Sequence, residues 1–337
     1  MGRKTVYNHN LTANWEQVSA VNKGFVNDYL RYCRSQDRSP MTLLQYGEWL
    51  KVFFCWNLNE NGDKQFTNLK KRDFVYYFGW CRENGMSANR IASLKSVLSS
   101  LSNEIELLYE DEYPTFKNQL RGLEAIHIDT VREKTVLSMD QLKKILQALV
   151  DKKQYQVACY LSLACSCGAR KAELIQIKVS DFTEDHKVFD GYMYATHELR
   201  SKGRGKKGKI IKKYVIVESF QPFLDLWMQE RERLGITTEE LFVTKSGGKI
   251  VPATISTANS FCSTISKIGE VPFYSHAARH FFCSYLRGLN LPDEVIRLIF
   301  SWESTELIKI YDDTPVSEKL DGFFKEFNNK NNEVKGE

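Results

Sequence analysis

The chain has 337 residues, more than one compact core usually holds, so two domains are expected. Its 42% hydrophobic and 26% charged residues are those of an ordinary globular protein, and no apolar run reaches the roughly 18–20 residues of a membrane helix. The net charge of +5 is modest, and the polar N-terminal stretch lacks the apolar core of a signal peptide, so a cytoplasmic location is expected.

Residues 1–15 are polar and predict a flexible lead, after which helical periodicity follows in four segments. The first starts near residue 22, and the second follows Ser39-Pro40, a typical N-cap with proline at the first helical position. The third covers about 70–84 and ends at Gly85, where a left-handed cap is expected, and the fourth starts at Ser87. In the second helix, the residues that recur with helical periodicity are Leu43, Leu44, Tyr46, Leu50 and Phe53. An all-helical domain is predicted over 16–123.

The segment from residue 111 is charged and loses periodicity after Leu123, so the linker is placed at 124–136. A second domain over 137–316 begins with a helix capped at Ser138, followed by an apolar helix pair joined at Gly168. Strand-like pieces at 187–196 and 209–217 predict one long β-hairpin. Further helices are expected at 221–234, 253–268, 277–289, 292–300, 304–311 and 317–327. The fold class is therefore mainly α, with a small antiparallel sheet in an α+β second domain.

Eight cysteines are scattered through apolar stretches of the sequence. They form no CxxC pair and no spacing typical of a zinc site, so reduced, buried thiols are expected. The positive charge, by contrast, is concentrated. Residues 199–217 contain eight Lys or Arg and no acidic residue, a pattern that suits a polyanionic partner.

The run SHAARHFFCSYL, residues 275–286, places His276 and Arg279 on one face of an apolar helix. Charged groups are seldom buried without a partner, so this pair predicts an anion. His276 and His280 have the spacing of a zinc-binding HExxH helix, but the glutamate is missing and no third ligand stands out, so no metal is predicted.

Four further features gain meaning from their order in the chain. They are Arg170 in GARKAEL, Lys202 in the basic hairpin, and Trp302 and Tyr311 in FSWESTELIKIY. Taken singly, each has an ordinary interpretation as a surface arginine, a solvated loop or a core aromatic residue. Taken in order with HAAR, and with Tyr311 nine residues after Trp302, they resemble the tyrosine recombinases of the phage integrase family.

The resemblance implies a fold and a reaction. Residues 16–123 would be the SAM-like core-binding domain and 137–316 the catalytic domain. Tyr311 would attack a DNA phosphodiester and form a 3′-phosphotyrosyl ester, while Arg170 and Arg279 bind the phosphate. His276 would assist the transfer, and Trp302 would pack against the tyrosine. Glu173 and His280 would contact these groups and hold them in position. Neither a metal nor another cofactor is expected.

Two features depart from the family pattern. Ser301 stands before Trp302, where glycine is usual, and the hairpin turn is long. The lysine that protonates the leaving oxygen is therefore open: Lys202 is first, then Lys206, Lys207 or Lys209.

Double-stranded DNA is the expected partner, held between both domains. Basic residues proposed to contact its phosphates are Lys70, Lys71, Arg72, Arg90 and Lys95 in the first domain and Arg204, Lys206, Lys207 and Lys209 on the hairpin. The tail 317–337 carries the apolar stripe Leu320, Phe323, Phe324 and Phe327, which packs either on its own domain or, as the resemblance suggests, on a neighbouring protomer of a tetramer.

Three functions are weighed. The first is a site-specific recombinase of a phage or mobile element. The second is a DNA-binding regulator, such as a phage-type repressor, which keeps the fold without recombining. The third, a metal-dependent nuclease, lacks ligands. The presence of Tyr311 favours the first.

Overall fold

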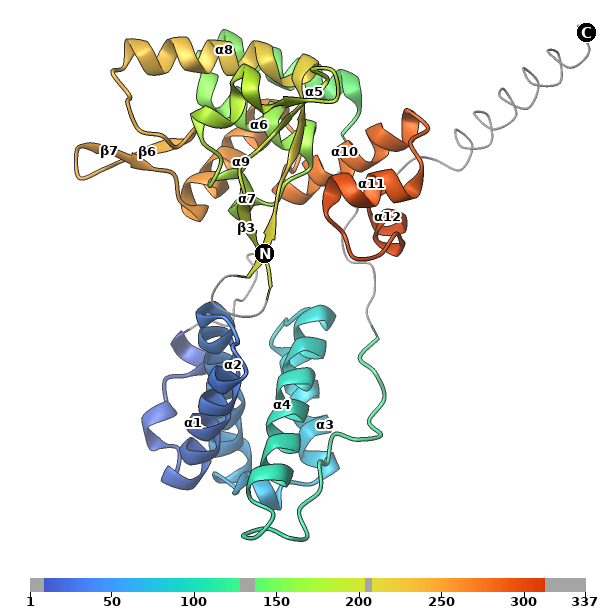
Figure 1. The fold of residues 1–337 in the computed structure, drawn as a ribbon. Helices are drawn as coiled ribbons and strands as arrows, with labels where there is room; N and C mark the ends of the chain where they lie inside the picture. The colour runs from blue at the N-terminus through green and yellow to red at the C-terminus, as the bar shows by residue number, and fades with distance from the viewer. Residues whose placement is uncertain (1–8, 128–136, 204–207, 313–337) are drawn as a thin grey trace, which may run out of the picture. The chain divides into compact units, whose positions relative to one another are not determined.

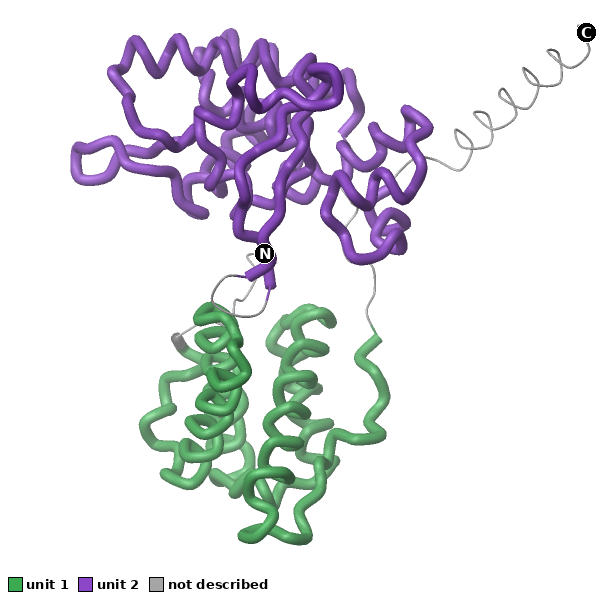
Figure 2. The backbone as a smooth tube through the Cα atoms, in the orientation of Figure 1, with its two compact units in different colours: residues 1–133, 204–206 green, residues 134–203, 207–337 purple. Residues whose placement is uncertain are grey.

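The computed structural model describes residues 9–127, 137–203 and 208–312. These residues divide into two compact units, with residues 9–127 in the first and residues 137–203 and 208–312 in the second (Figure 2). The predicted linker beyond residue 127, the hairpin residues Arg204, Lys206 and Lys207, and the tail stripe lie outside the described residues.

In residues 9–127, four helices build the N-terminal unit (Figure 1): α1 Ala20–Ser35, α2 Pro40–Asn61, α3 Lys71–Glu83 and α4 Ala88–Leu108, with a short 3-10 turn at Phe66–Asn68. Their ends follow the predicted chemistry. The Ser39 and Ser87 side chains accept hydrogen bonds from backbone N–H groups in the first turns of α2 and α4, which satisfies donors that have no partner inside the helix. Gly85, just after α3, has a φ of 73°, as the cap prediction requires.

The core of this unit is built from aromatic rings. Phe53 on α2 stacks on Phe74 of α3 with centroids 5.7 Å apart and meets Tyr77 edge-on at 4.9 Å, and both geometries are favourable for aromatic pairs. Leu44 was expected in the apolar stripe of α2, but its side chain is 55% exposed. Residue 44 lies one position beyond Leu43, so the helical repeat turns its side chain away from the core.

The segments on either side of these helices are more ordered than the sequence indicates. Residues His9–Leu11 and Trp15–Gln17 form 3-10 turns, and the ammonium groups of Lys23 and Lys51 lie over the Trp15 ring. The predicted lead over 1–15 thus contains a local turn at His9–Leu11, and its flexibility stays a prediction. After α4, Phe116 and Leu120 are buried in the same core.

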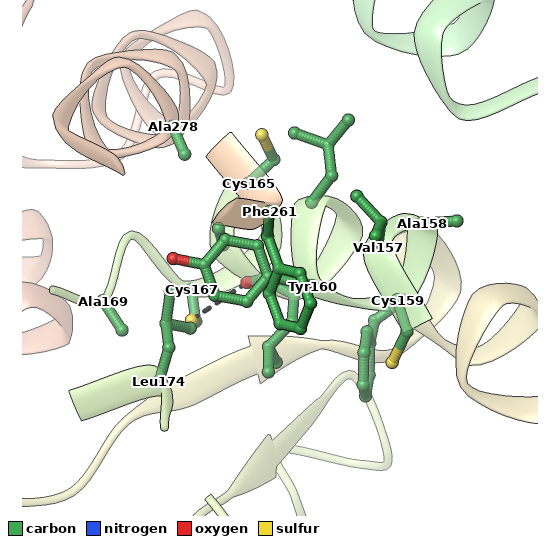
Figure 3. Packing of buried hydrophobic residues seen from close by; sticks show 14 of the residues in the cluster. Val157, Ala158, Cys159, Tyr160, Cys165, Cys167, Ala169, Leu174, Phe261 and Ala278 are labelled. Atoms are coloured by element: carbon green, nitrogen blue, oxygen red, sulfur yellow. Dashed lines mark hydrogen bonds between the residues drawn. The ribbon is translucent and has the colours of Figure 1, made fainter. Parts of the chain in front are cut away.

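The C-terminal unit is arranged around the buried helix α6. Its helices are α5 Met139–Asp151, α6 Tyr155–Cys167, α7 Lys171–Leu174, α8 Val217–Arg233, α9 Ile255–Gly269, α10 Ser275–Gly288, α11 Asp293–Phe300 and α12 Glu306–Tyr311, with 3-10 turns at Val179–Phe182 and Glu184–His186. Helix α6 contacts α5, α8, α9 and α10. Figure 3 shows Tyr160 beside Phe261 of α9, with centroids 5.2 Å apart. All eight cysteines are buried and none is placed in a disulfide in the described residues, and their reduced state stays an expectation.

The described residues of this unit also form three small antiparallel sheets. Strands β1 Lys187–Val188, β2 Met193–Ala195 and β5 Tyr214–Ile216 form one, β3 Leu199–Ser201 and β4 Lys209–Ile211 the second, and β6 Val243–Ser246 and β7 Lys249–Pro252 the third. The predicted single hairpin is thus split into two sheets, and the β6–β7 hairpin was not predicted. The fold class, mainly α with small antiparallel sheets, is confirmed.

Candidate active site

Arg170 is positioned by the turn between α6 and α7. Gly168 ends α6 with a φ of 57°, a conformation that disfavours side chains, and its carbonyl oxygen accepts a hydrogen bond from Arg279 Nη1 at 2.5 Å. A Cβ at this position would lie 2.6 Å from the ring of Phe300 and 2.8 Å from that of Phe282. Two features therefore require glycine at position 168: the left-handed turn and the close approach of the two rings.

Glu173 is the buried carboxylate beneath Arg170. It accepts a hydrogen bond from Arg170 Nη1 at 2.9 Å and another from the Ser201 hydroxyl at 2.6 Å. The ammonium of Lys213 lies 3.8 Å from its second oxygen. Burial would raise the pKa of Glu173, but Lys213 and these hydrogen bonds outweigh it and lower the pKa to about 2. The carboxylate is ionised throughout the neutral range and can hold Arg170 in place, as the sequence interpretation proposed.

Arg279, on α10, is 1% exposed and surrounded by rings. Its guanidinium carbon lies 4.8 Å from the Phe300 ring centroid, 5.2 Å from that of Trp302 and 5.5 Å from that of Tyr311. Burial and the nearby charge of Arg170 lower its pKa to about 10, which leaves it protonated at neutral pH. Among the described residues, Nε and Nη2 find no hydrogen-bond partner, so two buried donors remain for an anion.

Arg170, His276 and Arg279 line one cavity of about 210 Å³, together with Ser275. Residues 109 positions apart in the sequence are thereby brought to one anion-sized site with two positive charges. A larger apolar cavity of about 450 Å³ lies elsewhere, between α5 and α8, and its lining offers no comparable group of cations.

Tyr311 ends α12 at this site. Its hydroxyl lies 3.4 Å from Nδ1 of His276, and its ring is stacked on Trp302 with centroids 5.2 Å apart. The His280 ring is 4.7 Å away. Partial burial and the charges of Arg279 and Arg170 lower the pKa of His276, so its imidazole is neutral at pH 7 and able to accept a proton from a phenol.

The basic hairpin reaches the same site. Lys202 is exposed and directly follows Ser201, which also accepts a hydrogen bond from Arg170 Nη1 at 3.1 Å. Lys209 donates to the carbonyl oxygen of Ser301 at 3.0 Å, and Lys213 donates to that of Phe300 at 3.1 Å. Both lysines thus contact the end of α11.

Sequence reasoning missed Lys213 and Ser201. A signal for Lys213 was present, because Ile211, Lys213 and Val215 alternate along the chain and are all buried. This alternation places a lysine on an apolar face, where a charge requires a partner.

Ser301, which departs from the family pattern, has a φ of 55° and caps α11 in the left-handed conformation. Glycine adopts this conformation without strain, and glycine is the residue that the resemblance implies at this position. The fold keeps the turn with serine in place.

The residues of the N-terminal unit that were predicted to bind DNA phosphates differ in the contacts that they make within the protein. Lys70, Lys71 and Arg72 are exposed at the start of α3. Arg90 lies over the Trp49 ring at 4.4 Å. The ammonium of Lys95 donates to the carbonyl oxygens of Leu123 and Glu124 at 2.7 and 2.6 Å, which connects α4 to the chain that follows it, and its contact with DNA stays a prediction.

In the described ranges, no group of three His, Cys, Asp or Glu side chains is placed to hold a metal ion. Within the same ranges, no helix has both the length and the apolar character needed to cross a membrane.

Solved structures with this fold include integrases. A lambda integrase fragment in a dimer bound to a COC′ core site has a TM-score of 0.63 at 17% identity, covering 86% of this chain and 95% of that one. The Tn1549 transposon integrase in complex with circular intermediate DNA has a TM-score of 0.65 at 16% identity, covering 89% and 98%. At this identity, the likeness concerns the fold.

Sequence relatives extend the comparison. The SPbeta prophage-derived recombinase-like protein YomM of Bacillus subtilis (strain 168) is 34% identical over 255 residues, 74% of each chain. The tyrosine recombinase XerC of Psychromonas ingrahamii is 26% identical over 230 residues, 67% of this chain and 70% of that protein. Residues 26–104 match the N-terminal SAM-like domain of phage integrases, and residues 135–317 match the phage integrase family itself. The chain therefore belongs to the phage integrase family, the tyrosine recombinases.

Proposed function

We propose that the protein cuts and rejoins double-stranded DNA at specific sites, with Tyr311 as the nucleophile. The phenol oxygen attacks phosphorus and forms a 3′-phosphotyrosyl ester, while the bond to the 5′-oxygen breaks and that oxygen leaves as a hydroxyl. A 5′-hydroxyl of the exchanged strand then reverses the step and releases the tyrosine. The bond energy is kept in the ester, so rejoining needs no further energy source.

One observation carries the proposal: the Tyr311 hydroxyl lies 3.4 Å from His276, and the guanidinium of Arg279 lies beneath its ring. Unperturbed tyrosine is only about 0.1% ionised at neutral pH, so it requires a proton acceptor and nearby positive charge. The neutral imidazole and Arg279 supply these, and Arg170 completes the phosphate site.

The two arginines are proposed to stabilise the charge that develops on the non-bridging oxygens during transfer. Their forked donors match phosphate geometry, and Arg279 offers two buried donors without other partners among the described residues. Removing one such donor typically costs about 3–4 kcal/mol in the transition state, a hundredfold or more in rate. The indole N–H of Trp302 is likewise buried without a partner in the described part of the chain and is proposed to face the same phosphate.

Lys202 is proposed to protonate the leaving 5′-oxygen. Its exposure and the hydrogen bond between Arg170 and the neighbouring Ser201 support this role, because the lysine follows directly on a residue that contacts Arg170. Lys206, Lys207 and Lys209 are the alternatives. A substrate in which sulfur replaces the leaving oxygen separates them, because a thiolate leaves without protonation. Lys202→Ala is expected to lose cleavage of ordinary DNA and to regain it on this substrate, whereas equal loss on both substrates would assign the proton to another group.

Contacts outside the site are also proposed. The exposed Lys70, Lys71 and Arg72 bind DNA phosphates, which contributes salt-dependent affinity without reading sequence. A solved lambda integrase tetramer is bound to a Holliday junction, and we propose the same tetrameric assembly here, with the tail 317–337 exchanged between protomers. The reaction is proposed to need no metal and to take place on DNA of a phage or mobile element in the cytoplasm.

The decisive experiment traps the covalent intermediate. Genomic mapping of bound sites supplies the target, and a nick near the cleavage point lets the cut strand diffuse away. The wild-type protein is expected to leave a covalent protein–DNA band that is absent in Tyr311→Phe and retained in the matched control Tyr192→Phe, an exposed tyrosine outside the site. Tight binding by the wild type without any covalent band would indicate a DNA-binding regulator instead.

A further inference from the structure

Lys213 is a fully buried lysine that joins two parts of the site. Its side chain is 0% exposed, and its ammonium lies 3.8 Å from the Glu173 carboxylate and donates to the carbonyl oxygen of Phe300 at 3.1 Å. Glu173 holds Arg170, and Phe300 is the last residue of α11, two positions before Trp302. We propose that Lys213 is a positioning residue, which fixes the Trp302–Tyr311 segment to the arginine site through its charged ammonium.

The rings packed around Phe300 explain how the hydrogen bond from Lys213 to the Phe300 carbonyl can affect the position of Tyr311. The Phe300 ring stacks on Trp302 with centroids 4.2 Å apart, and Trp302 stacks in turn on Tyr311. The same ring lies over Arg279. A shift of the Phe300 backbone therefore moves the support of the nucleophile and one face of the phosphate site together.

Lys213 acts through other residues because it has no access to DNA. Its ammonium is fully buried, so it cannot donate a proton to a leaving oxygen without a rearrangement. This separates Lys213 from Lys202, which is exposed. Burying a charged pair is costly, and removal of Lys213 leaves Arg170 as the remaining charged partner of the buried Glu173 carboxylate. The pair thus persists only while both groups are ionised and in contact.

The charge on Lys213 depends on pH. Burial lowers its pKa and Glu173 on α7 raises it, while Arg279 on α10 and Arg170 lower it further; the Cys167 thiol on α6 faces the same ammonium. The balance is a pKa of about 8, below the ordinary value for lysine. The ion pair with Glu173 is therefore present at neutral pH and is lost as the pH rises through about 8.

The first test needs neither DNA nor activity. Hydrogen exchange is measured across the full chain for wild type, Lys213→Met and the matched control Lys267→Met, an exposed lysine on α9. Amides over 301–312 are expected to exchange at least about tenfold faster in Lys213→Met, while those of α5 stay within about twofold of wild type. The control is expected to match wild type throughout. Unchanged exchange over 301–312 in a folded Lys213→Met protein would overturn the inference.

The second test rests on the proposed function and uses the covalent-cleavage assay. The wild-type single-turnover rate is expected to fall as the pH rises through about 8, and Lys213→Arg, which stays charged, is expected to keep its rate to about one pH unit higher. Glu173→Gln removes the group that raises the pKa of Lys213, so the fall is expected at lower pH. An identical alkaline fall in wild type and Lys213→Arg contradicts the inference. If the wild type forms no covalent band, the proposed function fails, and the exchange experiment still decides the role of Lys213.

Discussion

Gly168→Ala tests whether the turn between α6 and α7 is fixed by the rings above it. The residue has a φ of 57°, and a left-handed conformation costs a side-chain-bearing residue about 1–2 kcal/mol. The new methyl group would also lie 2.6 Å from Phe300 and 2.8 Å from Phe282. These rings are 1% and 0% exposed, so they have little room to retreat, and such overpacking costs about 1–3 kcal/mol. The expected loss in the free energy of unfolding is about 2–5 kcal/mol.

Gly235→Ala is the matched control, because it separates strain from contact. Gly235 follows α8 with a φ of 66°, and a Cβ there meets nothing within 4 Å. The control is therefore expected to lose only the strain energy, about 1–2 kcal/mol. The steric contacts of the new methyl group at residue 168 cost about 1–3 kcal/mol beyond the strain. The most protected α6 amides are therefore expected to exchange about 5- to 150-fold faster in Gly168→Ala than in the control.

The same variant has a functional readout. The Gly168 carbonyl accepts the hydrogen bond from Arg279 Nη1, so displacement of this turn moves the buried guanidinium. Covalent cleavage is expected to fall by at least about tenfold in Gly168→Ala and to stay near wild type in Gly235→Ala. If both variants lose equal stability, the two rings are free to move and the steric reasoning is refuted.

Three further outcomes follow from the same structure. Ser301→Gly relieves a φ of 55° and is expected to raise the free energy of unfolding by about 0.5–1 kcal/mol in urea titrations; no gain would show that serine is unstrained there. Glu104 is buried, and burial, reinforced by a neighbouring aspartate, raises its pKa to about 7, so the N-terminal unit should lose stability as the pH rises from about 4.5 to about 7. Glu104→Gln is expected to flatten this dependence and to gain about 1–2 kcal/mol at alkaline pH, followed by tryptophan fluorescence, and an unchanged profile would contradict the assignment. Lys95→Met removes the donor to the Leu123 and Glu124 carbonyls, so faster exchange at residues 123–127 with unchanged DNA affinity is expected, whereas weaker binding alone would support its role as a DNA contact.

Helix positions were predictable wherever local chemistry decides them. Ser39, Ser87 and Ser138 each cap the helix that the sequence assigned to them, because an N-cap acts on backbone groups within three residues. The helix predicted over 221–234 begins earlier, at Val217. Its first turn contacts α6, where the Ser162 hydroxyl donates to the carbonyl oxygen of Ser219, and this long-range contact is not visible in the local sequence.

The strands were harder to predict because each is only two to four residues long. Alternation over so few residues is weak, and register depends on partners far along the chain. The sequence therefore predicts extended structure at 187–196 and 209–217, while the division into two sheets follows from tertiary pairing of β2 with β5 and of β3 with β4.

The residues of the candidate site differ in whether a sequence motif predicts them. Arg170, His276, Arg279 and Tyr311 are proposed from motif order, and the fold brings all four to one place. Lys213 belongs to no such motif, and its importance depends on a carboxylate 40 positions earlier. The sequence shows one part of this role, because alternate buried positions place a lysine among apolar side chains. A charge in such surroundings requires a partner. Only the three-dimensional fold identifies this partner as Glu173, the carboxylate that also accepts a hydrogen bond from Arg170, and this shared partner connects the buried lysine to the candidate active site.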